Sequence, residues 1–178
     1  MKITDVRAVR IAFPKTEPTA QPTRKGWTHT AEVANPMSRY PQYKRHRSLW
    51  LPKWGEVWCQ VTLEDGTIGL GQTGNGRAVA AVIDDHLAPL LVGENIMAHE
   101  RIADMMVRMT KPYGSTGLSS YAVSAIDLAL WDARGKMLQK PAYELLGGLQ
   151  KERILCYATG NDVDWYKELG FRAFKLAC

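Results

Sequence analysis

The sequence predicts an α+β domain followed by the first strands of a larger α/β domain. Residues 2–13 and 56–64 alternate apolar and polar side chains, as antiparallel strands with one face in water do. Residues 115–148 carry apolar side chains at steps of three and four, a helical spacing. Residues 154–160 and 171–177 are predicted to be two buried strands on either side of a helical pattern, which is typical of a parallel β-α-β unit.

The composition is that of a globular protein. The 178 residues are 46% hydrophobic and 23% charged, which is sufficient for a buried core. The net charge of +5 is modest, and the basic run at 44–47 (KRHR) is either a solvated loop or an anion-binding surface. Cys59, Cys156 and Cys178 have no CxxC spacing, which favours a reducing compartment. With no predicted signal peptide or membrane span, we expect a cytoplasmic protein without nucleic-acid or membrane partners.

The N-terminal strands are predicted to form a three-stranded meander, because Asp65-Gly66 makes a tight turn from 56–64 into a third strand at 67–71. Between the first two strands, residues 14–54 show little periodicity. A structureless segment of this length inside a compact domain is usually a functional lid. Its tryptophans argue against plain disorder, since they need a surface to pack against.

Two helices are expected next, at 77–92 and 97–110, with Asn75 as the N-cap of the first. His86 and His99 lie at polar positions of these helices, and for both we expect a surface or capping role. The long helix that follows is predicted to begin at an N-cap formed by Ser115 or Thr116. Apolar residues on its opposite side, Leu128 and Trp131 among them, predict a helix that is covered on most sides.

One ordered motif runs from this helix into the following turn. It consists of 124–132 (SAIDLALWD), Gly135-Lys136, Pro141 and 145–148 (LLGG). With the preceding element order, it resembles the enolase superfamily, and more narrowly its mandelate racemase branch. The resemblance implies that 1–148 form a capping domain with a lid at 14–54, and that 149–178 begin a truncated TIM-like barrel. In this family the motif is architectural, so Asp127 and Asp132 are expected to be structural acids.

Three further stretches resemble the acid-sugar dehydratases of the rhamnonate dehydratase type. They are 35–40 (NPMSRY) followed by Tyr43 and Arg47, 113–118 (YGSTGL), and 157–160 (YATG). The resemblance implies that the lid supplies an arginine and a histidine to the substrate. Arg47 has the matching spacing, and its alternative is a solvated loop arginine. His29 is the only histidine before the motif, and its spacing differs from the family pattern.

The end of the second barrel strand carries the remaining candidate. Racemase relatives often have KxK there, with the second lysine as general base. Here Lys175 occupies the first position and Ala177 the second, and residues two apart share a strand face. Lys175 is therefore expected to be a catalytic cation near the substrate carboxylate, or else a charged strand end at the surface. The missing second lysine disfavours racemisation and favours proton abstraction from one face.

The activity implied for the complete protein is Mg²⁺-dependent dehydration of an aldonic acid to a 2-keto-3-deoxy acid, by α-proton abstraction and enediolate stabilisation. Metal ligands and the general base are expected beyond Cys178, so these 178 residues should be inactive alone. A homo-oligomer is implied by the branch. Two alternatives remain: an epimerase or cycloisomerase of the same superfamily, and a non-catalytic interaction domain.

Overall fold

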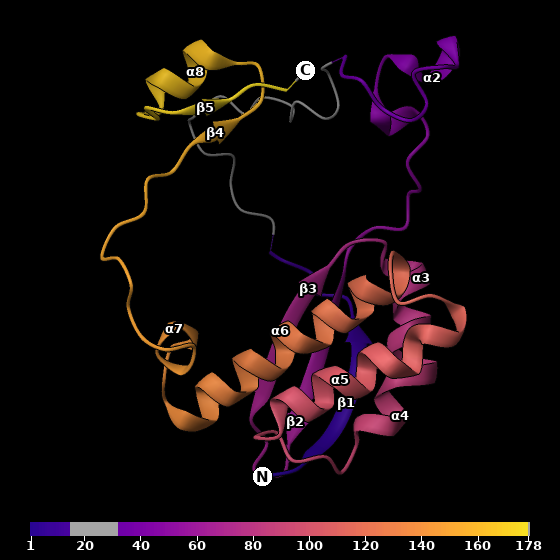
Figure 1. Cartoon of the computed structure of the whole chain (residues 1–178), viewed down its shortest axis with the longest axis vertical. Helices are drawn as coiled ribbons and strands as arrows, with labels where there is room; N and C mark the ends of the chain where they lie inside the picture. The colour runs from indigo at the N-terminus through magenta and orange to yellow at the C-terminus, as the bar shows by residue number, and fades with distance from the viewer. Residues whose placement is uncertain (15–31, 178) are drawn as a thin grey trace. The chain divides into compact units, whose positions relative to one another are not determined.

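The computed structural model describes residues 1–14 and 32–177. The chain divides into two compact units (Figure 1). The first consists of residues 1–13 and 53–149, and the second of 14–52 and 150–178. Within the described ranges, no helix is both long and apolar enough to cross a membrane.

The first unit is built on the predicted antiparallel meander. Strands β1 (Ile3–Val9), β2 (Val57–Leu63) and β3 (Ile68–Thr73) form one sheet in the order β1-β2-β3. In β2 every second side chain is buried, as the alternating sequence predicts. At the turn, Gly66 has a φ of +83°, and Asp65 Oδ1 accepts the Thr67 N–H at 2.9 Å. The predicted meander and its tight turn are therefore confirmed.

Helices cover one face of this sheet (Figure 1). They are α3 (Gly76–Ala81), the π-helical segment η2 (Val82–Leu87), α4 (Ala88–Leu91), α5 (His99–Thr110), the 3-10 turn η3 (Lys111–Tyr113) and α6 (Leu118–Leu138). Asn75 is the N-cap residue of α3, as predicted, and its carbonyl oxygen accepts the Val79 N–H at 3.1 Å. Its side chain makes no capping hydrogen bond, because its backbone is left-handed (φ 57°) and side-chain caps usually have an extended backbone.

Helix α6 rests directly on β3. A Cβ atom added to Gly69 would lie 2.0 Å from the carbonyl oxygen of Ala129, and one added to Gly71 would lie 2.1 Å from that of Ala125. The glycines thus let the helix and the strand approach at backbone distance. The small residues of α6 on this face are fully buried in the core.

Two expectations about α6 are wrong. The helix begins at Leu118 with Gly117 (φ 68°) as N-cap, so Ser115 and Thr116 lie too far ahead to reach its free N–H groups. The helix is also not covered on most sides, because Leu128 is 51% exposed and Tyr121 is exposed as well. After α6, the short helix α7 (Ala142–Leu145) follows.

The second unit contains a parallel pair, as predicted. Strands β4 (Ala158–Thr159) and β5 (Phe174–Lys175) pair in parallel, and α8 (Val163–Glu168) connects them. Both strands are much shorter than the strands predicted at 154–160 and 171–177. The prediction of a buried strand from residue 154 is wrong, because Ile154 is 79% exposed. A two-stranded pair covers only one edge of each strand, and parallel strands need helices on both faces to be buried.

Candidate active site

The segment predicted to be a lid has local order around the NPMS sequence. The Met37 N–H donates to Asn35 Oδ1 at 2.9 Å, and the Asn35 N–H donates to Ser38 Oγ at 3.0 Å. This arrangement is an Asx turn, in which the asparagine side chain takes the place of a backbone group. The short helix α2 (Pro41–Lys44) and the 3-10 turn η1 (Arg47–Leu49) follow. The described part of the lid is therefore a series of tight turns.

Arg47 begins η1, and it is half-buried. Among the described residues, three nitrogen atoms around this turn are buried and have no hydrogen-bond partner: His46 Nδ1, Arg47 Nε and Trp50 Nε1. Buried polar nitrogens are rarely left unpaired in native proteins, and an unpaired group commonly indicates a missing ligand or water.

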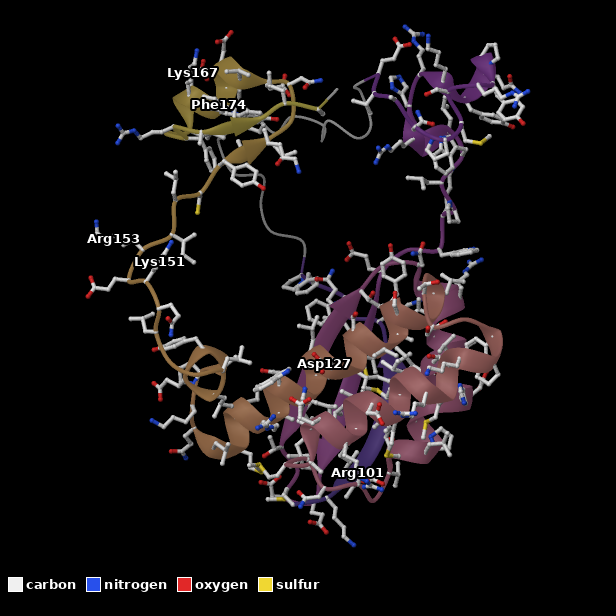
Figure 2. The ribbon with its side chains drawn as sticks, viewed as in Figure 1. Arg101, Asp127, Lys151, Arg153, Lys167 and Phe174 are labelled. Atoms are coloured by element: carbon white, nitrogen blue, oxygen red, sulfur yellow. The ribbon has the colours of Figure 1, made fainter. Side chains whose placement is uncertain are left out.

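Lys175 lies on β5 beside Thr159 of β4 and is exposed. Its carbonyl oxygen accepts the Gly160 N–H at 3.0 Å. Two residues further on, the Ala177 N–H donates to Asn161 Oδ1 at 3.1 Å, which holds the strand end to the loop after β4. Figure 2 labels the neighbouring Phe174 on the same strand. The backbone around Lys175 is therefore held, while its side chain is free to meet solvent or a ligand.

The structure does not join the predicted site residues. Arg47 and Lys175 lie in different segments of the second unit, and no hydrogen bond or ion pair connects them within the described residues. His29 lies outside the described residues. The roles of these three residues stay predictions.

The two acids of the SAIDLALWD motif make structural contacts in the first unit. Asp132 Oδ2 accepts the Leu70 N–H at 2.8 Å and Lys136 Nζ at 2.7 Å, so it links α6 to β3. Asp127 Oδ1 lies 2.8 Å from His99 Nε2, and this pair links α6 to α5. These contacts are those expected of structural acids.

For His99, the expected surface or capping role is wrong. The residue is buried against α6, and its ring centroid lies 4.5 Å from that of Trp131. The Asp127 carboxylate compensates for burying the imidazole. The two residues are 28 positions apart on different helices, so no local spacing in the sequence could reveal the pair. His86 instead lies near η3, with Nδ1 2.6 Å from Tyr113 Oη.

The described residues do not provide a set of ligands for a metal ion. Residues 1–14 and 32–177 contain no group of three or more histidine, cysteine, aspartate or glutamate side chains that could hold an ion. These residues therefore do not fit a Mg²⁺ centre on their own.

The fold and the motif together define a class of protein. An antiparallel meander under a helical layer, followed by a parallel β-α-β unit, is the N-terminal architecture of the enolase superfamily. Residues 53–147 match the family model described as mandelate racemase / muconate lactonizing enzyme, N-terminal domain. The chain belongs to the mandelate racemase / muconate lactonizing enzyme family.

Matches to individual proteins are more specific than the match to the family model. The chain is 41% identical, over 145 residues, to the L-rhamnonate dehydratase of Saccharopolyspora erythraea, covering 81% of this chain and 37% of that protein. A crystal structure of rhamnonate dehydratase from Gibberella zeae complexed with Mg is 30% identical with a TM-score of 0.86, covering 99% of this chain and 44% of that one.

A cycloisomerase is also similar. The 3,6-anhydro-D-galactonate cycloisomerase of Zobellia galactanivorans is 35% identical with a TM-score of 0.62, over 68% of this chain and 37% of that one. The chain thus spans about 37–44% of the length of these relatives.

Proposed function

We propose that this chain is the N-terminal part of an acid-sugar dehydratase, a hydro-lyase that converts an aldonic acid to a 2-keto-3-deoxy acid. The observation that carries the proposal is the 41% identity to an L-rhamnonate dehydratase over 81% of the chain. Because the chain covers 37% of that relative, the activity is assigned to the complete protein. These 178 residues alone are expected to be inactive.

Residues 1–148 are proposed to form the capping domain with its lid at 14–54, and 149–178 to form the start of the barrel. The boundary between the two compact units at residues 149 and 150 supports the start of the barrel, whereas residues 14–52 group with 150–178. The parallel β4–β5 pair supports the second part, because a TIM barrel consists of parallel strands joined by helices.

Arg47 is proposed to bind the carboxylate or two neighbouring hydroxyls of the sugar acid. A guanidinium offers a planar fork of N–H donors that matches either group. Its buried, unpartnered Nε supports the role, because a bound anion would satisfy it. His29 is proposed as a second lid contact on the resemblance alone.

Lys175 is proposed as a fixed cation beside the substrate carboxylate. Its place at the C-terminal end of a parallel strand supports this role, since that end carries the active site in TIM-barrel enzymes. In the overall reaction, the α-proton leaves, the 3-hydroxyl departs as water, and the enol product tautomerises to the 2-keto acid. A positive charge near the carboxylate stabilises the negative charge that develops on proton loss.

Mg²⁺ is proposed as the cofactor of the complete protein, as in the Gibberella zeae structure that contains Mg. When bound, it would stabilise the enediolate. Its ligands are expected among residues that follow Cys178, and no residue of this chain is assigned to it.

A sugar acid is the proposed partner, and a homo-oligomer is the proposed assembly. A reducing, cytoplasmic location is proposed because Cys59 and Cys156 are both free thiols, one buried and one exposed.

The test is an assay of the complete protein with Mg²⁺ on a panel of aldonic acids that includes L-rhamnonate. We expect at least one acid to give a 2-keto-3-deoxy product. If no acid loses water, the dehydratase proposal fails.

The second candidate is a cycloisomerase or epimerase, favoured by the similarity to the Zobellia galactanivorans enzyme. The same assay in D₂O separates the two. Deuterium incorporation at the α-carbon without water loss would support the second candidate.

A further inference from the structure

A cavity of about 460 Å³ lies in the first unit, between the first turn of α5 and the second half of α6. Its lining includes His99, Glu100 and Arg101 from α5, Trp131 and Arg134 from α6, and Leu145 from α7. This volume is in the range of small-molecule sites, which combine apolar surface with a few polar groups. None of the predicted site residues lines it.

Arg134 is the main cation of this cavity. Its guanidinium carbon lies 4.5 Å from the centroid of the Trp131 ring, a cation–π contact that orients the group without using its N–H donors. Its Nε is buried and donates to no partner, and no ion pair neutralises the side chain within the described residues. The structure therefore holds a positive charge in place with its Nε–H donor unused.

The start of α5 adds further positive potential. This 12-residue helix has no side-chain cap, so the N–H groups of its first turn have no side-chain acceptor. The positive end of the helix dipole favours an anion at this position. His99 also lines the cavity; its Nε2 is held by Asp127, while its Nδ1 is buried without a hydrogen-bond partner.

The remaining charges have identified positions. Arg101 is paired with Glu94, so it adds little net charge. Glu100 is exposed, and its carboxylate can turn into solvent. Its negative charge still opposes an anion, which makes this residue useful as a test.

We propose that this cavity binds a small organic anion through a carboxylate or phosphate group, held by Arg134 and the first turn of α5. The Trp131 and Leu145 side chains would contact the apolar part of the ligand. This site is independent of the proposed dehydratase activity, because it shares no residue with the lid or with β5.

The experiment is isothermal titration calorimetry of the complete protein with two probes, inorganic phosphate and succinate. We expect saturable binding of at least one probe, and the one that binds identifies the preferred group. Arg134→Gln should weaken binding about tenfold, because a charge-assisted contact is lost. Glu100→Gln should tighten binding about two- to threefold by removing a repelling charge. Arg108→Gln is the matched control, since Arg108 lies on α5 but pairs with Asp104 and does not line the cavity.

The proposal is overturned if neither probe shows saturable binding at millimolar concentration, or if Arg108→Gln weakens binding as much as Arg134→Gln. Circular dichroism establishes that each variant folds. If Arg134→Gln does not fold, Glu100→Gln decides the matter, because it changes only an exposed side chain; unchanged affinity would then reject the site. Since the readout is binding, this outcome does not depend on turnover of any sugar acid.

Discussion

At the scale of single residues, burial decides the chemistry of several side chains. Cys59 is fully buried in the sheet, and this desolvation raises the pKa of its thiol to about 12, with the negative charges of Asp84 and Asp5 adding to the effect. Cys156 is exposed. The sequence shows three widely spaced cysteines, but only the fold shows which of them is inaccessible.

We expect Cys59 not to react with a thiol reagent in the folded protein at pH 8. With a pKa of about 12, the thiolate fraction is about one in 10⁴, and the reagent cannot reach the sulfur. Labelling with Ellman's reagent should give the same number of fast-reacting thiols in the wild type and in Cys59→Ala. In urea, the wild type should gain one reactive thiol over the variant. Rapid native labelling of Cys59 would contradict its burial.

The His99–Asp127 pair is the second residue-scale feature. Its 2.8 Å contact joins two helices, and the His99 side chain is only 9% exposed. A double-mutant cycle with His99→Gln and Asp127→Asn should give a coupling free energy of about 1 kcal/mol, reduced from a fully buried value because Asp127 is partly exposed. Urea unfolding measures it. A coupling free energy near zero would mean that the pair does not link α5 to α6.

At the scale of elements, alternation in the sequence predicted the meander because only one face of the sheet is buried. Periodicity likewise placed the long helix. The N-cap of α6 was missed because Gly117 acts through its backbone, and a side-chain rule cannot detect that. The role of Gly69 and Gly71 also could not be predicted, since it depends on a helix some 55 residues later approaching β3.

The contact between α6 and β3 predicts unequal effects of two alanine substitutions. Gly71→Ala places a methyl group 2.1 Å from the Ala125 carbonyl oxygen, and we expect it to lower the free energy of unfolding by about 2–3 kcal/mol. Gly74→Ala is the control, because nothing lies within 4 Å of its added Cβ, and its effect should stay within about 0.5 kcal/mol. Thermal and urea unfolding compare the two. Equal effects would contradict the close approach.

At the scale of the whole molecule, the order of elements identifies the family, whereas the active site is only partly predictable. Motif spacing predicted Arg47 and Lys175 as site residues, and both roles stay proposals. Their joint geometry could not be predicted, because they lie about 130 positions apart on η1 and β5, and spacing along the sequence does not fix how such distant elements meet. The apolar residues at 154–157 are exposed because the two-stranded β4–β5 pair does not cover them.

The measurement that tests this account most directly is kcat/KM of the complete protein on its best aldonic acid, for Arg47→Lys and Arg45→Lys. Lysine keeps the charge but loses the bidentate fork, so Arg47→Lys should lower kcat/KM about 100-fold. Arg45→Lys, an exposed neighbour in the same basic run, should leave it within about twofold. Equal values for the two variants would contradict a lid that carries substrate-binding chemistry to the barrel.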